Sequence, residues 1–252
     1  MANPFELCGR VAVVTGANTG LGQALAVALA AAGADVALVG RSPMDETAAQ
    51  IASLGRTSIA IAADLSTVAP IANVVRQVED WRGRLDVLVN NAGIIRRADA
   101  LEFTEADWDA VMDTNLKSVF FLSQAAARRM VARGCGGKII NVASMLSFQG
   151  GIRVASYTSA KSGLAGLTRL LANEWAGKGI NVNAIAPGYF ETNNTTALRA
   201  DPERSAAILA RIPAGQWGKP DQLGGAAVFL ASSASDYVHG ITLPVDGGWL
   251  AR

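Results

Sequence analysis

Short runs of continuous apolar residues alternate with longer stretches of helical periodicity along almost the whole chain. The short runs are rich in Val, Ile, Ala and Leu and show little alternation with polar residues. This pattern is typical of strands that are covered on both faces. The runs that predict strands are Val11–Thr15, Asp35–Val39, Ser58–Ala62, Val87–Asn90, Lys138–Val142, Asn181–Ile185 and Ile241–Val245.

Ala-rich segments with helical spacing lie between these strands. They cover residues 20–32, 44–54, 67–81, 106–132, 156–177 and 220–232. Regular alternation of strands and helices predicts a parallel sheet with helices on both of its faces. Because no linker, charge block or repeat divides the chain, we expect one α/β domain over residues 1–252. The expected architecture is a Rossmann fold with a doubly wound, seven-stranded sheet.

Residues 188–219 break the alternation. They carry polar and turn-forming residues, and they are too long for an ordinary connection. Long connections in compact domains are usually functional lids or disordered segments. Ile208, Leu209, Ile212 and Trp217 provide apolar anchors, which favours a mobile substrate lid.

Composition excludes several classes of function. The formal charge is only +1, from 22 basic and 21 acidic residues, whereas nucleic acids and anionic membranes require clustered positive charge. One His and two Cys cannot form a His-rich or Cys/His zinc site, so we expect no metal. Residues 1–10 lack the features of a secretory signal, and the longest apolar run, 24–34, is too short to cross a membrane. These features predict a cytoplasmic protein.

A glycine-rich turn follows the first predicted strand and leads directly into a helix. Glycines allow the backbone to turn sharply and to approach a pyrophosphate, and a helix N-terminus offers free N–H groups to anions. The spacing differs from the G-x-G-x-x-G pattern, but the position after the first strand of a doubly wound sheet favours a dinucleotide. The candidate cofactor residues in this turn are Gly16, Asn18, Thr19, Gly20, Leu21 and Gly22.

Further cofactor contacts are expected where other strands end, because ligands of open α/β sheets bind at the carboxyl ends of strands. Asp64 and Leu65 follow the third strand, where a carboxylate can accept a hydrogen bond from an adenine amino group or can cap a helix. The fourth and sixth strands are followed by small residues that leave room for a cofactor. These candidates are Asn91, Ala92, Gly93, Pro187 and Gly188, with Thr192 shortly after.

The end of the second strand bears on the choice between NAD and NADP. The sequence there is Val39-Gly40-Arg41-Ser42, with no acidic residue to bind the ribose hydroxyls. Arg41 can neutralise a 2′-phosphate or stack on the adenine. The residues themselves therefore favour NADP.

Tyr157 and Lys161 are four residues apart at the start of a predicted helix, so they share one face. An ammonium group near a phenol lowers its pKa, which is about 10 when unperturbed, and so favours proton exchange near neutral pH. Ser144, just after the fifth strand, can hold a substrate oxygen by a hydrogen bond. By itself a Tyr-x-x-x-Lys pair is common on surface helices.

Together, the Thr15–Gly22 turn, Asn90-Asn-Ala-Gly93, Asn115, Ser144, Tyr157-x-x-x-Lys161 and Pro187-Gly188 resemble the short-chain dehydrogenase/reductase family in order and spacing over essentially the whole chain. The resemblance implies that Tyr157 is the general acid or base and that Ser144 polarises the carbonyl. It also implies that Lys161 lowers the pKa of Tyr157 and binds the nicotinamide ribose, and that Asn115 supports a proton-relay water. The expected activity is hydride transfer to or from a nicotinamide cofactor.

A narrower resemblance, to sugar-acid dehydrogenases of this family, is visible at 149–154, 186–195, 212–218 and 245–252. It implies that the substrate is an acidic deoxy- or keto-sugar, whose carboxylate requires a cation. Arg153, Arg96 and Arg97 are candidates for that cation, although each can also be a solvated surface residue. Candidate hydroxyl contacts are Gln149, Asn193 and Asn194. Because such dehydrogenases are mainly NAD-linked, we place NAD first and keep NADP as an alternative.

Two other functions remain open from the sequence. One is reduction of a different carbonyl, such as a 3-oxoacyl thioester or a polyol, and the other is a non-catalytic dinucleotide-binding regulator. The complete set of Ser144, Tyr157, Lys161 and Asn115 speaks against the regulator. The family resemblance also implies a homotetramer, whose contacts we expect on the helices at 106–132 and 156–177 and at the tail Gly247–Ala251.

Overall fold

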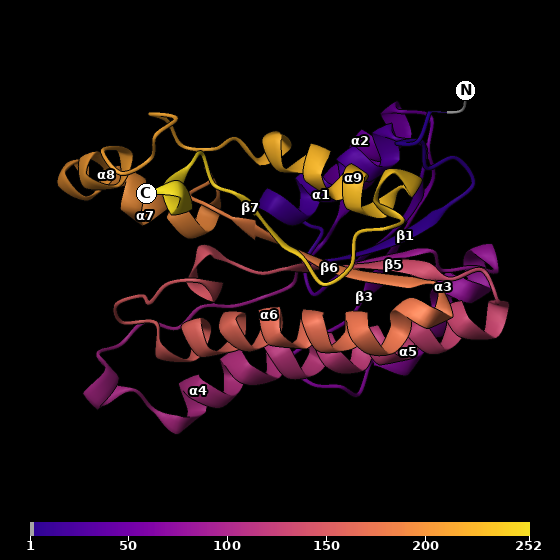
Figure 1. Cartoon of the computed structure of the whole chain (residues 1–252), viewed down its shortest axis with the longest axis horizontal. Coiled ribbons are helices and arrows are strands. Elements are labelled where there is room, and N and C mark those ends of the chain that lie inside the picture. Colours follow the sequence, from indigo (N-terminus) through magenta and orange to yellow (C-terminus); the bar gives the residue numbers. More distant parts are fainter. Residues whose placement is uncertain (1–2) are drawn as a thin grey trace.

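In the computed structural model, which describes residues 3–252, parallel strands form a 7-stranded sheet in the order β3-β2-β1-β4-β5-β6-β7 (Figure 1). Residues 1–2, part of the segment inspected for a secretion signal, lie outside the described chain. The strands are β1 (Val11–Thr15), β2 (Asp35–Gly40), β3 (Ser58–Ala62), β4 (Val87–Asn90), β5 (Gly137–Val142), β6 (Ile180–Pro187) and β7 (Thr242–Val245).

Helices cover both faces of this sheet. Figure 1 shows α1, α2 and α9 on one face and α4, α5 and α6 on the other, and α3 packs on the second face with α5. The helices are α1 (Gly20–Ala31), α2 (Asp45–Ser53), α3 (Ile71–Arg82), α4 (Glu105–Met112), α5 (Ser118–Arg133), α6 (Ala155–Trp175), α7 (Thr196–Ala200), α8 (Pro202–Leu209) and α9 (Gly224–Ala231).

Burial on two faces explains the continuous apolar strands. Every residue of β1, β4 and β6 is buried, whereas the edge strands β3 and β7 are only partly buried. Two apolar clusters, one on each face, share the strands between them. Each central strand therefore needs apolar residues at consecutive positions, and the predicted Rossmann sheet is confirmed.

The helix expected over 106–132 is interrupted. A π-helical turn, Asp113–Lys117, separates α4 from α5 and contains Asn115. π-Turns inside helices are rare and commonly occur at functional sites. The apolar periodicity continues through this turn, which is why the sequence predicted a single helix.

The sheet topology locates the place where a ligand can bind. The chain winds outward from β1 through β2 to β3, then returns to β4 on the other side of β1. At such a switch point the connections leave the sheet in opposite directions, and a crevice opens at the carboxyl ends of β1 and β4.

Residues 188–219 lie at this end of the sheet and contain α7 and α8, which Figure 1 places beside the C-terminus. Ile208, Ile212 and Trp217 are buried in an apolar cluster with Met145 and Trp249. The segment thus has the apolar anchors that the sequence predicted. Within residues 3–252, no helix has both the length and the apolar character that crossing a bilayer requires.

Candidate active site

A cavity of about 490 Å³ opens at the carboxyl ends of the strands. It is lined by residues of the glycine-rich turn, the turns after β4, β5 and β6, the start of α6 and the segment 188–219. The candidate residues that line it are Gly16, Asn18, Thr19, Gly20, Leu21, Gly22, Asn91, Ala92, Gly93, Arg97, Ser144, Gln149, Tyr157, Lys161, Pro187, Gly188, Thr192, Asn193 and Asn194. Most of the residues selected from the sequence therefore meet in one place.

The glycine-rich turn has the shape that a pyrophosphate requires. Gly16 has a φ of 65°, and a Cβ at Gly22 would overlap the Gly16 carbonyl oxygen. Asn91 holds the turn against the end of β4, since its Nδ2 donates to the carbonyls of Thr15 at 2.9 Å and Gly16 at 3.2 Å. No side chain of the described chain caps the N-terminus of α1, and its first turn contains no acidic residue. Its free N–H groups and positive dipole end suit an anion, so a dinucleotide fits here.

Thr47 supports this turn from α2, a role that no sequence pattern indicated. Its side chain is completely buried on α2, and its hydroxyl donates to the Ala17 carbonyl at 2.8 Å. A threonine in an amphipathic helix does not by itself reveal a long-range hydrogen bond.

Tyr157 and Lys161 lie one turn apart on α6, as predicted, with the ammonium nitrogen of Lys161 5.6 Å from the centre of the Tyr157 ring. Lys161 is only 4% exposed, and its Nζ donates to the Val142 carbonyl at 2.5 Å. Burial lowers the pKa of Lys161 to about 8, because no carboxylate among the described residues offsets the loss of solvent.

The pKa of Tyr157 differs from the sequence expectation. Burial raises it above its ordinary value, while a hydrogen bond with Ser144 and the charge of Arg97 act in the opposite direction. The predicted lowering by Lys161 is not found in the chain alone. The physical reason is the geometry of Lys161, whose ammonium points to the Val142 carbonyl at the end of β5 rather than to the phenol.

Asn115 does not line the cavity but positions a segment that does. Its Oδ1 accepts from Ile94 N at 2.9 Å and its Nδ2 donates to Ile94 O at 2.8 Å. The neighbouring Gly93 leaves space for it, since a Cβ there would lie 3.2 Å from Asn115 Oδ1. The π-helical turn thereby holds the loop after β4 at the cavity that contains the catalytic candidates.

Arg41, Asp64 and Leu65 lie outside the cavity. Arg41 and Asp64 are both largely exposed and face each other at 3.9 Å, a weak ion pair. Asp64 accepts from Ser66 N at 3.0 Å, and this hydrogen bond lowers its pKa. Leu65 is buried, and its carbonyl accepts from the Ser118 hydroxyl at 2.7 Å.

The arginines considered for a substrate carboxylate have different surroundings. Arg153 forms an ion pair with Asp99 at 3.4 Å, and Arg96 forms one with Asp107 at 3.1 Å. Neither lines the cavity, whereas Arg97 does and its charge acts on Tyr157. Arg204, at the start of α8, also lines the cavity; the sequence offered no reason to distinguish it from other surface arginines.

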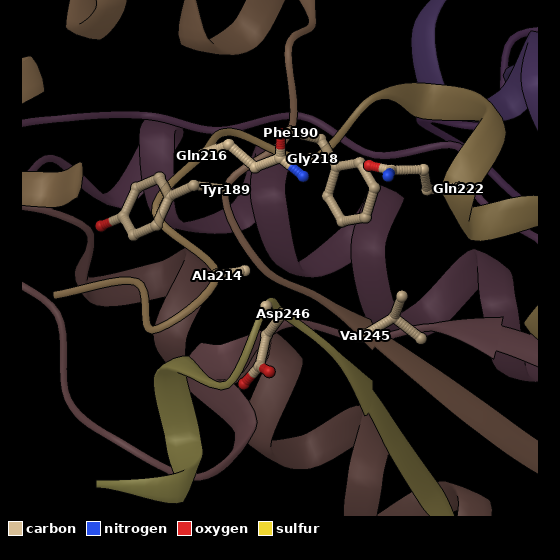
Figure 2. Close-up of a pocket in the computed structure, with 9 residues that line it drawn as sticks. Tyr189, Phe190, Ala214, Gln216, Gly218, Gln222, Val245 and Asp246 are labelled. Carbon is tan, nitrogen blue, oxygen red and sulfur yellow. The ribbon is translucent and has the colours of Figure 1, made fainter.

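A second cavity has a volume of about 220 Å³, and Figure 2 shows the residues that line it. Tyr189 and Phe190 line both cavities, and Asp246 and Val245 close the second one from the end of β7. None of the site residues selected from the sequence lines it. The catalytic candidates that line a cavity, Ser144, Tyr157 and Lys161, therefore all lie at the larger one.

Comparisons with known proteins agree with this geometry. A family profile described as enoyl-(acyl carrier protein) reductase matches residues 16–250. The 2-dehydro-3-deoxy-D-gluconate 5-dehydrogenase of Escherichia coli is 61% identical over 248 residues, which cover 98% of each chain.

Solved structures are similar over nearly the full length. An Agrobacterium tumefaciens protein, provisionally assigned as a 2-deoxy-D-gluconate 3-dehydrogenase and crystallised with NADP, has a TM-score of 0.93 and 62% identity over 100% of both chains. A gluconate 5-dehydrogenase from Burkholderia cenocepacia, in complex with NADP and tartrate, has a TM-score of 0.93 and 42% identity, covering 99% of this chain and 98% of the other.

Proposed function

The chain belongs to the short-chain dehydrogenase/reductase family, and from that premise we propose that it interconverts a hydroxyl and a carbonyl on an acidic deoxy- or keto-sugar. It is an NAD(P)-dependent oxidoreductase that acts on a hydroxyl group. The names of its relatives point to 2-dehydro-3-deoxy-D-gluconate or 2-deoxy-D-gluconate as the substrate.

The observation that carries the proposal is the joint position of Ser144, Tyr157, Lys161 and Arg97 on one cavity. Three of these groups serve the proton transfer of a carbonyl–alcohol reaction. The fourth is a cation without an ion-pair partner among the described residues, as recognition of an acidic substrate requires.

In this mechanism the Tyr157 hydroxyl donates a proton to the carbonyl oxygen during reduction and takes it back during oxidation. Ser144 holds the same oxygen by a hydrogen bond. Lys161 lies one helical turn from Tyr157 with its ammonium directed to the Val142 carbonyl, and in this proposal it would bind the nicotinamide ribose. A bound nicotinamide supplies or accepts the hydride. Asn115 holds the Ile94 loop in place, and its support of a relay water is part of the proposal.

For the substrate carboxylate, Arg97 is a better candidate than Arg153. Arg97 faces the cavity, and Arg204 approaches it from α8. Arg153 is paired with Asp99 and lies outside, so its proposed contact with the substrate requires that pair to open. Gln149, Asn193 and Asn194 are the proposed hydroxyl contacts from the cavity wall.

Arg41 influences which cofactor form is used. Its guanidinium is exposed and only weakly paired, so it is free to turn to a 2′-phosphate. Similar proteins crystallised with NADP support this role. We therefore propose that NADP is accepted alongside NAD, which the sequence resemblance placed first.

The remaining proposals concern the surroundings of the site. Residues 188–219 act as a lid, and the chain forms a cytoplasmic homotetramer. Partly exposed apolar residues on the expected contact helices support the tetramer, with Phe121 on α5 and Leu170 on α6 as examples.

A substrate panel tests the function. Keto-sugar acids, 3-oxoacyl thioesters and neutral polyols are each offered with NAD(H) and NADP(H), and kcat/KM is measured. We expect the sugar acids to exceed the other classes by at least about tenfold, because a desolvated charged pair contributes about 1.5–3 kcal/mol. A preference for an acyl thioester would refute the proposed substrate.

A pair of variants tests the carboxylate contact. Arg97→Ala should raise KM for a sugar acid about tenfold and KM for a neutral sugar much less. Arg153→Ala is the matched comparison, since its guanidinium is paired elsewhere. If Arg153→Ala raised KM for the sugar acid more than Arg97→Ala did, Arg153 would be the residue that binds the substrate carboxylate.

A further inference from the structure

The last residues of the chain form a turn that is fixed by hydrogen bonds. The Asp246 carboxylate accepts from Gly248 N and Leu250 N, both at 2.9 Å. Gly247 and Gly248 have φ values of 66° and 90°, which permit the reversal that follows β7. Trp249 begins a short 3₁₀ turn directly after them. Its backbone position is therefore set by the Asp246 side chain.

The indole of Trp249 is held on several sides and is only 4% exposed. The Tyr189 ring lies 4.9 Å away, centre to centre, at an angle of 60°, and the Arg211 guanidinium lies 3.9 Å from the indole ring centre. The same apolar cluster contains Met145, the residue after Ser144. Because the ring cannot turn freely, the direction of its N–H group is also fixed.

That N–H group points to the side chain of Gln149. Trp249 Nε1 donates to Gln149 Oε1 at 3.2 Å, across 100 positions of sequence. An indole nitrogen donates and never accepts, so the carboxamide oxygen must face Trp249. The amide nitrogen then faces away from it, and it has no hydrogen-bond partner within residues 3–252. Gln149 lines the catalytic cavity.

We propose that Trp249 is a positioning residue, which orients the Gln149 carboxamide so that it presents only N–H donors to an acceptor oxygen of the substrate. The proposal rests on the proposed function for the identity of that substrate. A sugar acid carries carboxylate, carbonyl and hydroxyl oxygens that can accept such a bond. The C-terminal turn thus takes part in substrate selection although it does not line the catalytic cavity.

A double-mutant cycle tests whether Trp249 acts through Gln149. Trp249→Phe keeps an aromatic ring in the cluster but removes the N–H group. We expect it to raise KM for the sugar acid about fivefold, the effect of one lost neutral hydrogen bond, with kcat and the Kd of NADPH unchanged within twofold. In a Gln149→Ala background the same change should raise KM no further. Additive effects of the two changes, or an unchanged KM in Trp249→Phe, would overturn the proposal.

Trp217→Phe is the matched control. Trp217 is buried in the same cluster and packs edge-on against Tyr189, with ring centres 5.4 Å apart, but it makes no hydrogen bond to Gln149. Its replacement removes the same atoms from the cluster. Because Trp217 also anchors the proposed lid, we expect any rise in KM for the sugar acid to be smaller than in Trp249→Phe and to be the same in the wild-type and Gln149→Ala backgrounds. A rise equal to that of Trp249→Phe would mean that general loosening of the cluster is responsible.

The indole N–H signals in a ¹H–¹⁵N spectrum separate this proposal from the proposed function. The signal of Trp249 is the one that disappears in Trp249→Phe, and it should move upfield in Gln149→Ala. An unmoved signal would overturn the positioning role whatever the substrate is. Absence of sugar-acid turnover in the wild type, with the signal shift present, would overturn only the proposed function.

Discussion

Buried charges at the two ends of the parallel strands have opposite surroundings. We call these ends the strand-start edge and the strand-end edge of the sheet. At the edge where the strands begin, Asp86 is 1% exposed and is surrounded by donors: Val11 N at 2.8 Å, Arg84 Nε at 2.7 Å and Arg133 at 2.5 Å. At the edge where the strands end, Lys161 is also buried but meets only the Val142 carbonyl. One charge has ion-pair partners and the other has none within the described chain.

This difference separates stability from function. Burial would raise the pKa of Asp86, but hydrogen bonds from Arg84 and Val11 N, with the charge of Arg133, hold it below the ordinary value. Its ionised form therefore stabilises the fold. The pKa of Lys161 is lowered to about 8 by burial alone, so burial destabilises its charged form in the folded chain. Strongly shifted pKa values are concentrated at functional sites, which agrees with the position of Lys161 on the cavity.

The largest expected effect is at the strand-end edge. Tyr157→Phe removes the hydroxyl that transfers the proton in the proposed mechanism, while the ring stays in place. We expect kcat to fall about 10³-fold, since positioned acid–base groups contribute roughly 10²–10⁴-fold. The Kd of NADPH and the free energy of unfolding should change little. Steady-state kinetics and a fluorescence titration of the cofactor measure the two effects.

Tyr237→Phe is the control for that variant, because Tyr237 is fully exposed and lines neither of the two cavities. Its kcat should equal that of the wild type. If Tyr157→Phe retained more than a tenth of the wild-type kcat, the proton-transfer role of Tyr157 would be refuted.

The second effect is at the opposite edge. Asp86→Ala removes the acceptor for a buried backbone N–H and for three arginines, counting Arg10 at 3.7 Å. We expect the free energy of unfolding to fall by about 2–4 kcal/mol. This loss is smaller than is usual when a buried ion pair is broken, because the arginines can turn to solvent. The kcat of the folded variant should be unchanged. Urea unfolding measures the loss.

A pH series sharpens this result. The folded-state pKa of Asp86 is depressed, so its contribution is complete above the ordinary aspartate pKa of about 4 and is lost as the pH falls through the folded-state value. The wild type should therefore lose its advantage over Asp86→Ala in acid. Asp236→Ala, at the exposed partner of Lys138, is the comparison and should cost less than about 1 kcal/mol.

The features of the fold and of the site that depend on local sequence patterns could be predicted from the sequence. Continuous apolar runs identified the strands, because burial on both faces acts on every residue of β1 and β4. The glycine spacing identified the tight turn after β1 that we propose as the cofactor site, since only glycine fits at Gly16 and Gly22. The four-residue spacing of Tyr157 and Lys161 placed both side chains on one helical face.

Features that depend on distant partners could not be predicted. Arg153 adopts a φ of 63° and pairs with Asp99, although its position between Ser144 and Tyr157 pointed to the substrate. The contact between Trp249 and Gln149 joins residues 100 positions apart. Local composition contains no information about either pair, because each forms only when separate loops fold against each other.

The third prediction tests whether the buried lysine opposes stability. Lys161→Met keeps the length of the side chain and removes its charge. Turnover should fall, while the free energy of unfolding at pH 7 rises by about 1–3 kcal/mol, a gain limited by the lost bond to the Val142 carbonyl. Kinetics and urea unfolding of the same preparation give both values. A variant that was both inactive and less stable would contradict the comparison between the two edges.

The pH dependence has a definite sign. The folded-state pKa of about 8 lies below the unfolded value of about 10.4, so between them the unfolded chain binds more protons. The contribution of Lys161 therefore makes the wild type more stable as the pH rises from about 8 to 10. The difference in unfolding free energy between Lys161→Met and the wild type should shrink over that window. A constant difference would mean that Lys161 has an ordinary pKa.

The smallest effect concerns a charge that lies at the strand-end edge but outside the cavity. Arg41 is exposed, and its ion pair with Asp64 is long, at 3.9 Å, and therefore weak. Its replacement by Ala should change the free energy of unfolding by less than about 0.5 kcal/mol. If Arg41 binds a 2′-phosphate, kcat/KM with NADPH should fall about tenfold and that with NADH should stay within twofold. Equal losses with both cofactors would mean that Arg41 stacks on the adenine. Either outcome assigns Arg41 to cofactor binding, because a stabilising arginine, like those around Asp86, would show its effect in unfolding instead.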